Sequence, residues 1–201
     1  MPEQMSLLAT ERPKRVHYFD LETCRSAGEV GGWDFIDRMG MACGVIYDSA
    51  DQEFRVYREP EANALVEDLR RADLVIGFNH IRFDYRVLSA YSTFNFRILP
   101  SFDILDDITR ILGHRLKLES LASATLGKGK SADGLQSLRW VKEGRMDLVC
   151  DYCKQDVEVT RKLFEYGARE GRVAYEKSGT LVSVPVKWEV NRLIEEARQR
   201  R

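Results

Sequence analysis

The sequence predicts an α/β fold in which helices cover both faces of a mixed central sheet. Near the N-terminus, two runs of β-forming residues are joined by a short polar turn, which indicates an antiparallel hairpin. Further along, apolar runs alternate with stretches that carry apolar residues at three- and four-residue steps, which is typical of helices between parallel strands. Residues 73–78 are almost continuously apolar, as in a strand that is covered on both faces.

Composition narrows the class of protein. The chain has 201 residues, of which 44% are hydrophobic, enough for one domain with a sizeable core. The formal net charge of −1 gives no global attraction for nucleic acid, so such binding would need a local basic patch. No apolar run reaches transmembrane length and the first residues lack a signal-peptide core, so we expect a cytoplasmic protein without a membrane partner. The four cysteines are few and irregularly spaced, and we expect no disulfide framework.

The first half of the chain supplies most of the predicted strands. Residues 15–22 are rich in β-formers and predict the first strand, and residues 39–48 and 53–58 predict the hairpin. A proline near the start of residues 60–71, with leucines and a valine on one side, predicts a helix there. Residues 73–78 then predict the strand that is buried on both faces.

The second half is predicted to be mainly helical. Its main element is an amphipathic helix over residues 147–164, where Val149, Tyr152, Val159 and Leu163 share one face. The other predicted elements are helices over residues 83–91, 106–112, 116–126 and 135–142, a strand within residues 96–104, a hairpin over residues 171–188 and a charged helix over residues 188–201.

Three parts of the chain follow from these elements. We expect residues 1–14 to be a flexible leader and residues 15–170 to be the main domain. Residues 171–201 are expected to be a hairpin and a helix appended to that domain, as a partner surface, a dimer surface or a cover for the sheet edge.

Four carboxylates interrupt otherwise apolar elements. Asp20 and Glu22 close the first strand, two residues apart and therefore on the same side of it. Asp84 follows the buried strand, and Asp156 lies on the apolar face of the long helix, where an unpaired charge would be costly. Each also has an ordinary interpretation: a polar strand end for the first two, a helix N-cap for Asp84 and a buried ion pair with arginine for Asp156.

A metal site would explain all four acids together. Groups beyond the carboxyl ends of strands in an α/β sheet collect in one crevice, which is where Asp20 and Asp84 are expected. If Asp156 packs against the same crevice, four like charges converge and cannot all remain ionised unaided. Two divalent cations would resolve this, and hard oxygen ligands select Mg²⁺ or Mn²⁺.

Three sequence motifs resemble a known family. They are Phe19-Asp-Leu-Glu-Thr23, the run from Gly77 to Asp84, and Tyr152-Cys-Lys-Gln-Asp156, in that order. From about residue 16 to residue 166 the chain resembles the DnaQ-like, DEDD-type 3′–5′ exonucleases of the ribonuclease H-like superfamily. It is most similar to domains found alone in bacteria or beside helicase modules. Tyr152, four residues before Asp156, matches the DEDDy branch.

The resemblance implies a ribonuclease H-like fold and a two-metal mechanism of phosphodiester hydrolysis at a 3′ end. In it, Asp20 would bridge both metals, and Glu22 and Asp156 would hold the metal that carries the attacking water. Asp84 would bind the second metal, through water. Tyr152 would orient the attacking water, or would only pack beside the site, since its ordinary pKa is too high for a free general base.

Several further residues are expected to contact the substrate: Thr23, Trp33, Asn79, His80, Arg82, Phe83, Lys128 and Lys130. Alternatives stay open for some of them. Asn79 could instead hold its loop, Trp33 could pack in the core, and Lys128 and Lys130 could form a solvated face.

Other acids and the cysteine pair have less specific patterns. Asp103, Asp106 and Asp107 are expected to be acids at the start of a helix, where they offset the helix dipole, rather than metal ligands. Cys150 and Cys153 have a redox spacing but lie within a predicted helix, without the usual context for a redox or zinc function.

The predicted function is a metal-dependent 3′–5′ exonuclease that acts on single-stranded or frayed nucleic acid, DNA or RNA. A structure-selective nuclease or ribonuclease on the same fold is the first alternative, and a non-catalytic nucleic-acid-binding module is the second. Since the net charge is near zero, a helicase, polymerase or repair complex is expected to deliver the substrate.

Overall fold

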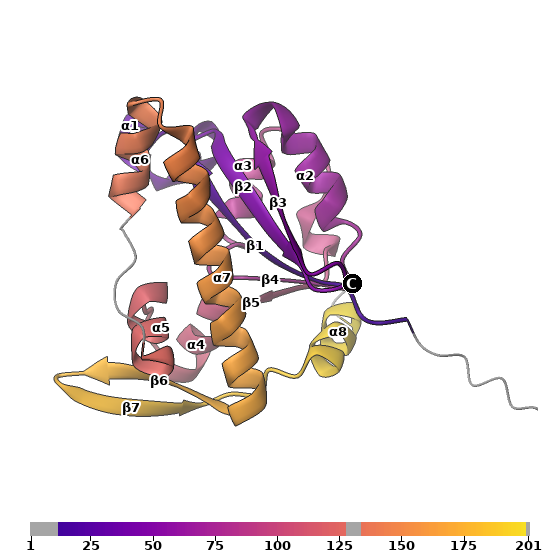
Figure 1. The fold of residues 1–201 in the computed structure, drawn as a ribbon, viewed down its shortest axis with the longest axis vertical. Helices are drawn as coiled ribbons and strands as arrows, with labels where there is room; N and C mark the ends of the chain where they lie inside the picture. Colours follow the sequence, from indigo (N-terminus) through magenta and orange to yellow (C-terminus); the bar gives the residue numbers. More distant parts are fainter. Residues whose placement is uncertain (1–11, 128–133, 200–201) are drawn as a thin grey trace, which may run out of the picture.

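The computed structural model describes residues 12–127 and 134–199, so the predictions for Lys128 and Lys130 lie outside the described residues. Its centre is a five-stranded sheet in the order β3-β2-β1-β4-β5 (Figure 1). β1 pairs antiparallel with β2, and β2 with β3, while β1 and β4, and β4 and β5, are parallel. The predicted mixed sheet is therefore confirmed. The strands are β1 (Val16–Thr23), β2 (Met41–Asp48), β3 (Glu53–Arg58), β4 (Leu74–Gly77) and β5 (Ser101–Asp103).

Helices cover the sheet on both faces, as predicted. The described helices are α1 (Ala27–Val30), α2 (Ala62–Leu69), α3 (Asp84–Leu88), α4 (Ile104–Leu112), α5 (Leu118–Leu126), α6 (Gly134–Lys142), α7 (Met146–Glu170) and α8 (Val190–Gln199). Three short 3₁₀ segments, η1 (Trp33–Arg38), η2 (Glu59–Glu61) and η3 (Phe96–Ile98), lie between them. A separate hairpin of β6 (Arg172–Lys177) and β7 (Thr180–Pro185) packs beside α5, at one end of the molecule (Figure 1).

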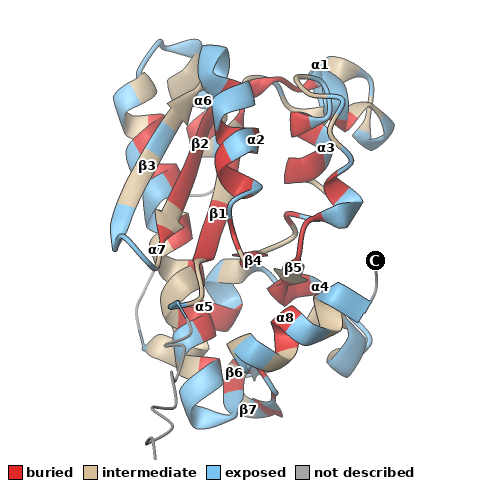
Figure 2. Ribbon diagram, turned by 90° about the vertical axis from the view of Figure 1, so that its right-hand side faces the viewer, coloured by how far each residue is buried: buried red, intermediate tan, exposed pale blue. Residues whose placement is uncertain are grey.

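The alternation of side chains along β1 separates two cores. Tyr18 points to the face that α7 covers, and Phe19 and Leu21 point to the face that α2 and α3 cover. Since successive side chains of a strand alternate, both faces of β1 can be buried at once. Figure 2 shows the consequence, because the central strands are mostly buried while the helices present exposed outer faces.

α7 is the longest helix and extends beyond the predicted range at both ends. Its buried stripe includes Val149, Val157 and Leu163, at the spacing expected for one helix face. Val159, predicted for this stripe, is only half-buried. The helix ends where Gly171 adopts a left-handed conformation with φ of 67° and its N–H bonds back to Gly167.

The structure corrects several sequence predictions. α3 is shorter than the predicted helix over residues 83–91, because residues 89–91 form a turn. α1 and η1 lie between β1 and β2, where no helix was predicted, and α1 begins with a capping box between Ser26 and Glu29. No helix among the described residues is both long and apolar enough to cross a membrane.

The structure joins one pair of cysteines, although no disulfide framework was predicted. Cys43 in β2 and Cys150 in α7 are joined as a disulfide, with their Cα atoms 5.8 Å apart. Spacing along the sequence could not reveal this pair, because 107 residues separate the two cysteines and only the packing of α7 on β2 brings them together.

Candidate active site

The end of β1 places two carboxylates in the middle of the sheet. Asp20 and Glu22 lie on the same side of β1, which pairs with β2 on one edge and β4 on the other. They therefore have buried strands as neighbours rather than open solvent. Both side chains line a cleft at this end of the sheet.

α7 brings the third carboxylate to the same place. It packs across β1 and β2, and its Asp156 lies close enough to Asp20 and Glu22 that one carboxylate oxygen of each falls within 4.8 Å of the others. Asp156 is far from Asp20 and Glu22 in the sequence. Their convergence is as predicted, and it rules out a simple polar strand end for Asp20 and Glu22.

Asp84 joins the group by a different route. It is only 2% exposed, and its Oδ1 accepts a hydrogen bond from the Leu21 N–H at 3.0 Å. The N-cap of α3 is Phe83, so the interpretation of Asp84 as an N-cap is wrong. Its hydrogen bond instead holds Asp84 at the Leu21 backbone of β1, although Asp84 lies outside the set of three acids whose oxygens fall within 4.8 Å of one another.

Burial raises the pKa of every carboxyl group in the cluster. Burial and then the charges of Asp84, Asp156 and Glu22 raise the pKa of Asp20 well above its usual range. Burial also raises the pKa of Glu22 to about 8, that of Asp84 to about 7 and that of Asp156 to about 6.

The donor set fits a divalent cation. The charges that act on Asp20 and Glu22 most strongly are those of the other carboxylates, with no lysine or arginine of the described residues among them. A buried ion pair between Asp156 and arginine is likewise not found among the described residues. Converging hard oxygen donors without a paired cation are the ligands that Mg²⁺ and Mn²⁺ prefer.

Two other residues of α7 contact the acids. The Tyr152 hydroxyl hydrogen-bonds the Asp156 carboxylate one helical turn later and lowers its pKa. Burial, followed by the charges of Asp156 and Glu22, raises the pKa of Tyr152 itself. The Cys153 thiol lies 3.3 Å from the backbone oxygen and 3.6 Å from Oδ2 of Asp20. The sequence spacing of Cys150 and Cys153 gave no sign of this contact. A redox pair of these two cysteines is not supported, because Cys150 is paired with Cys43.

The cleft over the acids has a volume of about 660 Å³. One wall carries Trp33, which is 69% exposed, with its ring 6.3 Å from that of Phe83 in an edge-to-face arrangement. The lining also includes Leu118, from α5, and Leu135, which is 65% exposed on α6. An exposed aromatic ring in an otherwise partly apolar lining offers a surface on which a flat base could stack.

Only some of the predicted substrate contacts line the cleft. Thr23, Trp33, Asn79 and Phe83 line the cleft. The prediction for His80 was wrong, because its side chain is completely buried and packs under Gly77. Arg82 is exposed but lies outside the cleft lining. Among the described lining residues that the sequence prediction missed are Arg25, Lys117, Leu118, Glu119, Leu135 and Leu138.

The three acids at the start of α4 act as predicted, as helix-start acids. Asp103 is the N-cap, and its side chain accepts from the N–H groups of Leu105 and Asp106. Asp107, in the first turn, accepts from the Trp188 Nε1–H at 2.8 Å.

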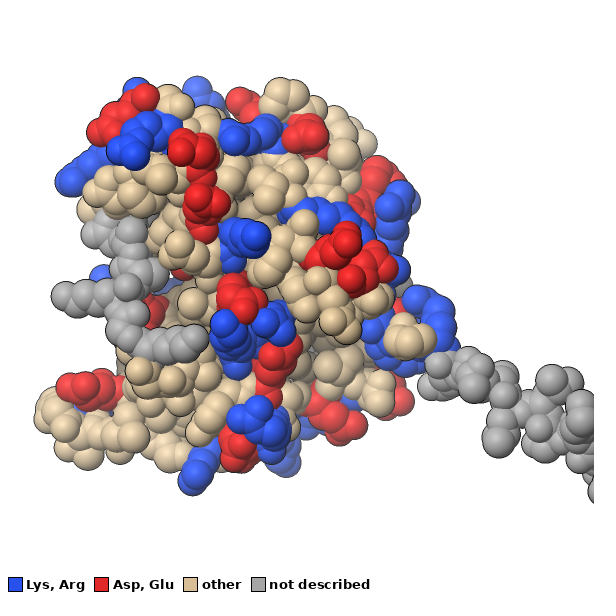
Figure 3. Space-filling model, viewed as in Figure 1, with Lys and Arg blue, Asp and Glu red and all other residues tan. Residues whose placement is uncertain are grey.

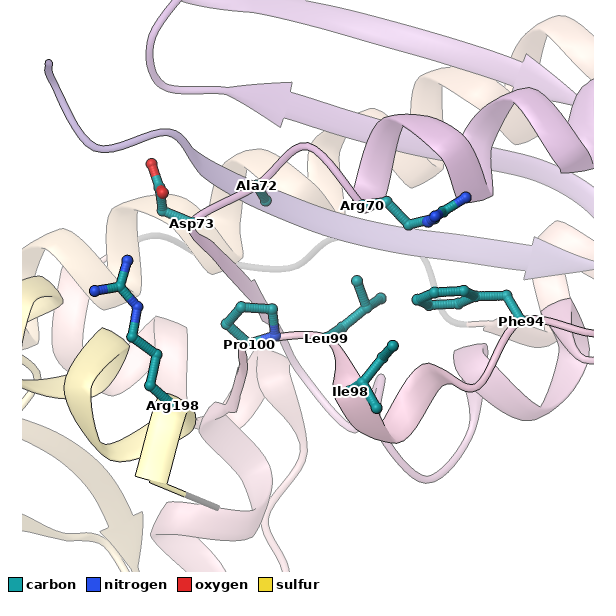
Figure 4. A pocket seen from close by; sticks show the side chains of 8 residues that line it. All are labelled: Arg70, Ala72, Asp73, Phe94, Ile98, Leu99, Pro100 and Arg198. Atoms are coloured by element: carbon teal, nitrogen blue, oxygen red, sulfur yellow. The ribbon is translucent and has the colours of Figure 1, made fainter. Parts of the chain in front are cut away.

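A second pocket, of about 300 Å³, is lined by η3, the end of α2 and the end of α8 (Figure 4). The acid in its lining, Asp73, is paired with Arg12 at 2.9 Å. Arg70 there lies over the ring of Phe94. Unlike the cleft at the end of β1, this pocket has no cluster of carboxylates among its described lining residues.

Comparisons with known proteins agree with this geometry. A solved structure, the family B DNA polymerase from the hyperthermophilic archaeon Pyrobaculum calidifontis, has a similar fold with a TM-score of 0.57 and 17% sequence identity. The similarity covers 77% of this chain but only 24% of the polymerase chain, so this chain spans about a quarter of that protein. No curated protein is a significant match to the sequence.

A comparison with protein-family models assigns the chain to a superfamily. The model of the RNase H superfamily matches residues 17–167, which run from β1 through most of α7. All four carboxylates and Tyr152 fall within this range. The chain belongs to the RNase H superfamily.

Proposed function

We propose that this protein is a metal-dependent 3′–5′ exonuclease of the DnaQ-like, DEDDy type. The observation that carries the proposal is the convergence of Asp20, Glu22 and Asp156 in an open cleft, with Tyr152 bonded to Asp156. Asp20, Glu22 and Asp156 would hold divalent ions, and Asp84 would complete the set from the side of β1. Divalent ions at such a site lower the pKa of water toward neutrality and stabilise the charge of a reacting phosphodiester.

The role of Tyr152 follows from its raised pKa. A hydroxyl that keeps its proton donates to Asp156 and can accept from, or donate to, a water beside it. We therefore assign Tyr152 to orienting the attacking water. The ring also packs edge-to-face with Trp140 at 6.3 Å, so packing and orientation are served by the same side chain.

The shape of the cleft supports action at a strand end. α1 and α6 both contribute residues to its lining, and an ion pair of 2.8 Å between Lys142 and Glu29 joins these two helices. Figure 1 shows them together at one end of the molecule. We propose that this linked pair of helices restricts entry to the cleft, which would favour a terminus over a continuous strand.

Nucleic-acid affinity is expected to be modest. The face in Figure 3 carries intermixed basic and acidic side chains, and several of them on α7 form ion pairs with each other, as Arg161 does with Glu158 and Glu165. We propose that a helicase, polymerase or repair complex delivers the 3′ end. The fold similarity to part of a DNA polymerase chain is consistent with such a setting.

The direct test uses 5′-labelled single-stranded DNA and RNA with Mg²⁺ or Mn²⁺. We expect a ladder of products shortened from the 3′ end, with Asp20→Ala inactive and Asp107→Asn, which keeps the acid cluster intact, active. A phosphorothioate at the 3′ terminus should delay the ladder. Internal cuts would favour the structure-selective nuclease. Equal activity in the wild type and Asp20→Ala would contradict the proposal, and binding without Mn²⁺-dependent hydrolysis would indicate a non-catalytic module.

A further inference from the structure

The connection from β4 to α3 carries two residues of the candidate site, Asn79 and Asp84. A single side chain outside the cleft contacts three successive residues of this connection. That side chain is Asp103, the last residue of β5, which pairs with Gly77 at the end of β4. Asp103 is 4% exposed. A carboxylate buried to this extent needs several hydrogen-bond donors, and the donors found here identify what it does.

Three of its contacts go to the connection itself. The Asn79 N–H donates to Oδ1 at 2.8 Å, and the Ile81 N–H donates to Oδ2 at 3.1 Å. Nδ1 of His80, between them, lies 3.4 Å from Oδ2. His80 and these N–H bonds hold the pKa of Asp103 below its usual value despite the burial, so the carboxylate is charged and its hydrogen bonds are of the stronger kind.

The same carboxylate also fixes the start of α4. Oδ1 accepts from the N–H groups of Leu105 at 3.0 Å and Asp106 at 3.3 Å. One group therefore ties the 79–84 connection to the first turn of a helix whose Ile104 and Ile108 belong to the core. This makes Asp103 a rigid support and not a side chain that follows the connection when it moves.

The connection needs such a support. Asn79 has φ of 70°, in the left-handed region that residues with a side chain adopt at a cost. His80 packs so closely on β4 that a Cβ at Gly77 would come within 2.7 Å of its ring. Beyond His80, Ile81 and Arg82 are exposed and have little packing of their own. At the end of the connection, the Asp84 carboxylate accepts the Leu21 N–H in β1, the strand that carries Asp20 and Glu22.

We propose that Asp103 is a positioning residue of this active site, which fixes the 79–84 connection so that Asn79 and Asp84 face the cleft. The structural part of this inference stands by itself, and only its kinetic part rests on the proposed function. Asp103→Asn is the informative variant, because it keeps the shape of the side chain but turns one acceptor into an N–H₂ that faces another donor. Asp107→Asn is the matched control, since Asp107 lies in the same first turn but bonds Trp188.

Limited trypsin digestion of the full-length protein tests the structural part. We expect cleavage after Arg82 to be about tenfold faster in Asp103→Asn than in the wild type, when normalised to cleavage after the exposed Arg97 outside the connection. Asp107→Asn should leave this ratio unchanged. An unchanged ratio in Asp103→Asn would overturn the proposal whatever the nuclease assay shows.

Hydrogen exchange of the wild type covers the case in which Asp103→Asn does not fold. The Asn79 and Ile81 amides should exchange slowly, although Ile81 has an exposed side chain, because both N–H groups bond to Asp103. Rapid exchange of both amides would overturn the proposal.

Kinetics test the consequence for the site. In folded Asp103→Asn we expect kcat to fall about 100-fold, because displacement of a site group by about 1 Å has an effect of this order. KM for an oligonucleotide should rise by no more than about tenfold, because Asn79 is displaced while Trp33 is untouched, so the loss should fall mainly on kcat. Asp103→Glu, which restores the charge, should recover part of kcat. A wild type without nuclease activity would refute the proposed function, while the digestion ratio would still decide the role of Asp103.

Discussion

At the scale of single residues, the orientation of the Asn79 amide carries the most specific chemical information. Its Oδ1 lies 2.6 Å from Nη2 of Arg115. A guanidinium only donates, so the amide oxygen must face Arg115 and the amide N–H₂ must face the other way. Since Asn79 lines the cleft, it offers hydrogen-bond donors to acceptor atoms of a substrate, such as phosphate oxygens.

Asn79→Asp should therefore weaken substrate binding while leaving the contact to Arg115 in place. The new acceptor would face phosphates and add a negative charge beside Asp84, so we expect KM for an oligonucleotide to rise about tenfold, or by about 1.4 kcal/mol. Steady-state kinetics on a 5′-labelled oligonucleotide measure this. Asn95→Asp, at the N-cap of η3 away from the cleft, is the control. An unchanged KM would exclude Asn79 from substrate contact.

Residue spacing predicted the acids of the site but not everything around them. A separation of two on a strand and of four on a helix was enough to place Asp20 with Glu22 and Tyr152 with Asp156. His80 was misplaced because its burial depends on the missing side chain of Gly77, which is a matter of packing between neighbours. The contact of Cys153 with Asp20 depends on where along its length α7 crosses β1, and no local sequence pattern determines that position.

At the scale of elements, Gly167 shows how α7 is joined to the end of the chain. It lies within the helix, where glycine usually costs about 1 kcal/mol relative to alanine. A Cβ there would come within 2.3 Å of the Trp188 ring, which stacks on Phe164 with the two ring planes 2° apart. Trp188 is also held by Asp107 and is 2% exposed, so it has little room to move.

Gly167→Ala is thus expected to destabilise the protein, against the usual helix preference. Overpacking of this kind costs about 1–3 kcal/mol, which corresponds to a decrease in Tm of roughly 2–12 °C for a chain of this size. Thermal unfolding followed by circular dichroism provides the measurement. Ala168→Ser, on the exposed side of the same turn, should change Tm by only a few degrees. A Tm above that of the wild type would mean that Trp188 does not pack on α7.

Most elements could be predicted from periodicity, while their ends and partners could not. The hairpin of β2 and β3, the buried β4 and the amphipathic α7 were all predicted, because each has a strong local pattern. α3 was predicted too long because its last turn depends on contacts with the rest of the fold. The Cys43–Cys150 pair and the Trp188 contact were missed because both join elements that are distant in sequence.

At the scale of the whole molecule, two groups of acids give opposite dependences of stability on pH. Despite burial, hydrogen bonds from the Ala50 N–H and the Tyr57 hydroxyl, and then ion pairs with Arg15 and Arg55, lower the pKa of Asp48 and Asp68. These groups stabilise the fold above their unfolded pKa of about 4, and their contribution is lost as the pH falls below it. In the site, the raised pKa values mean that the folded state binds more protons than the unfolded state between about pH 4 and pH 8.

The metal-free protein should therefore lose stability as the pH rises through this second window. The folded pKa of Glu22 is about 8, that of Asp84 about 7 and that of Asp156 about 6, so each opposes folding once it must ionise. A divalent cation that binds only the folded, ionised cluster reverses the effect. We expect Tm in EDTA to be lower at about pH 8 than at about pH 5, and Mg²⁺ or Mn²⁺ to raise Tm far more at the higher pH.

Glu22→Gln separates this cause from other effects of pH. The amide cannot ionise, so the variant should be more stable than the wild type at about pH 8 in EDTA. We expect a gain in the free energy of unfolding on the order of 2 kcal/mol, because one pKa unit corresponds to about 1.4 kcal/mol and the interacting acids share the shift. The same variant should respond less to Mn²⁺ and should lack nuclease activity. Differential scanning calorimetry with and without the cation measures both effects. A metal-free Tm that rises from about pH 5 to about pH 8 would contradict the raised pKa values of the cluster. A cation response of the same size at both pH values would mean that the buried cluster is not the binding site.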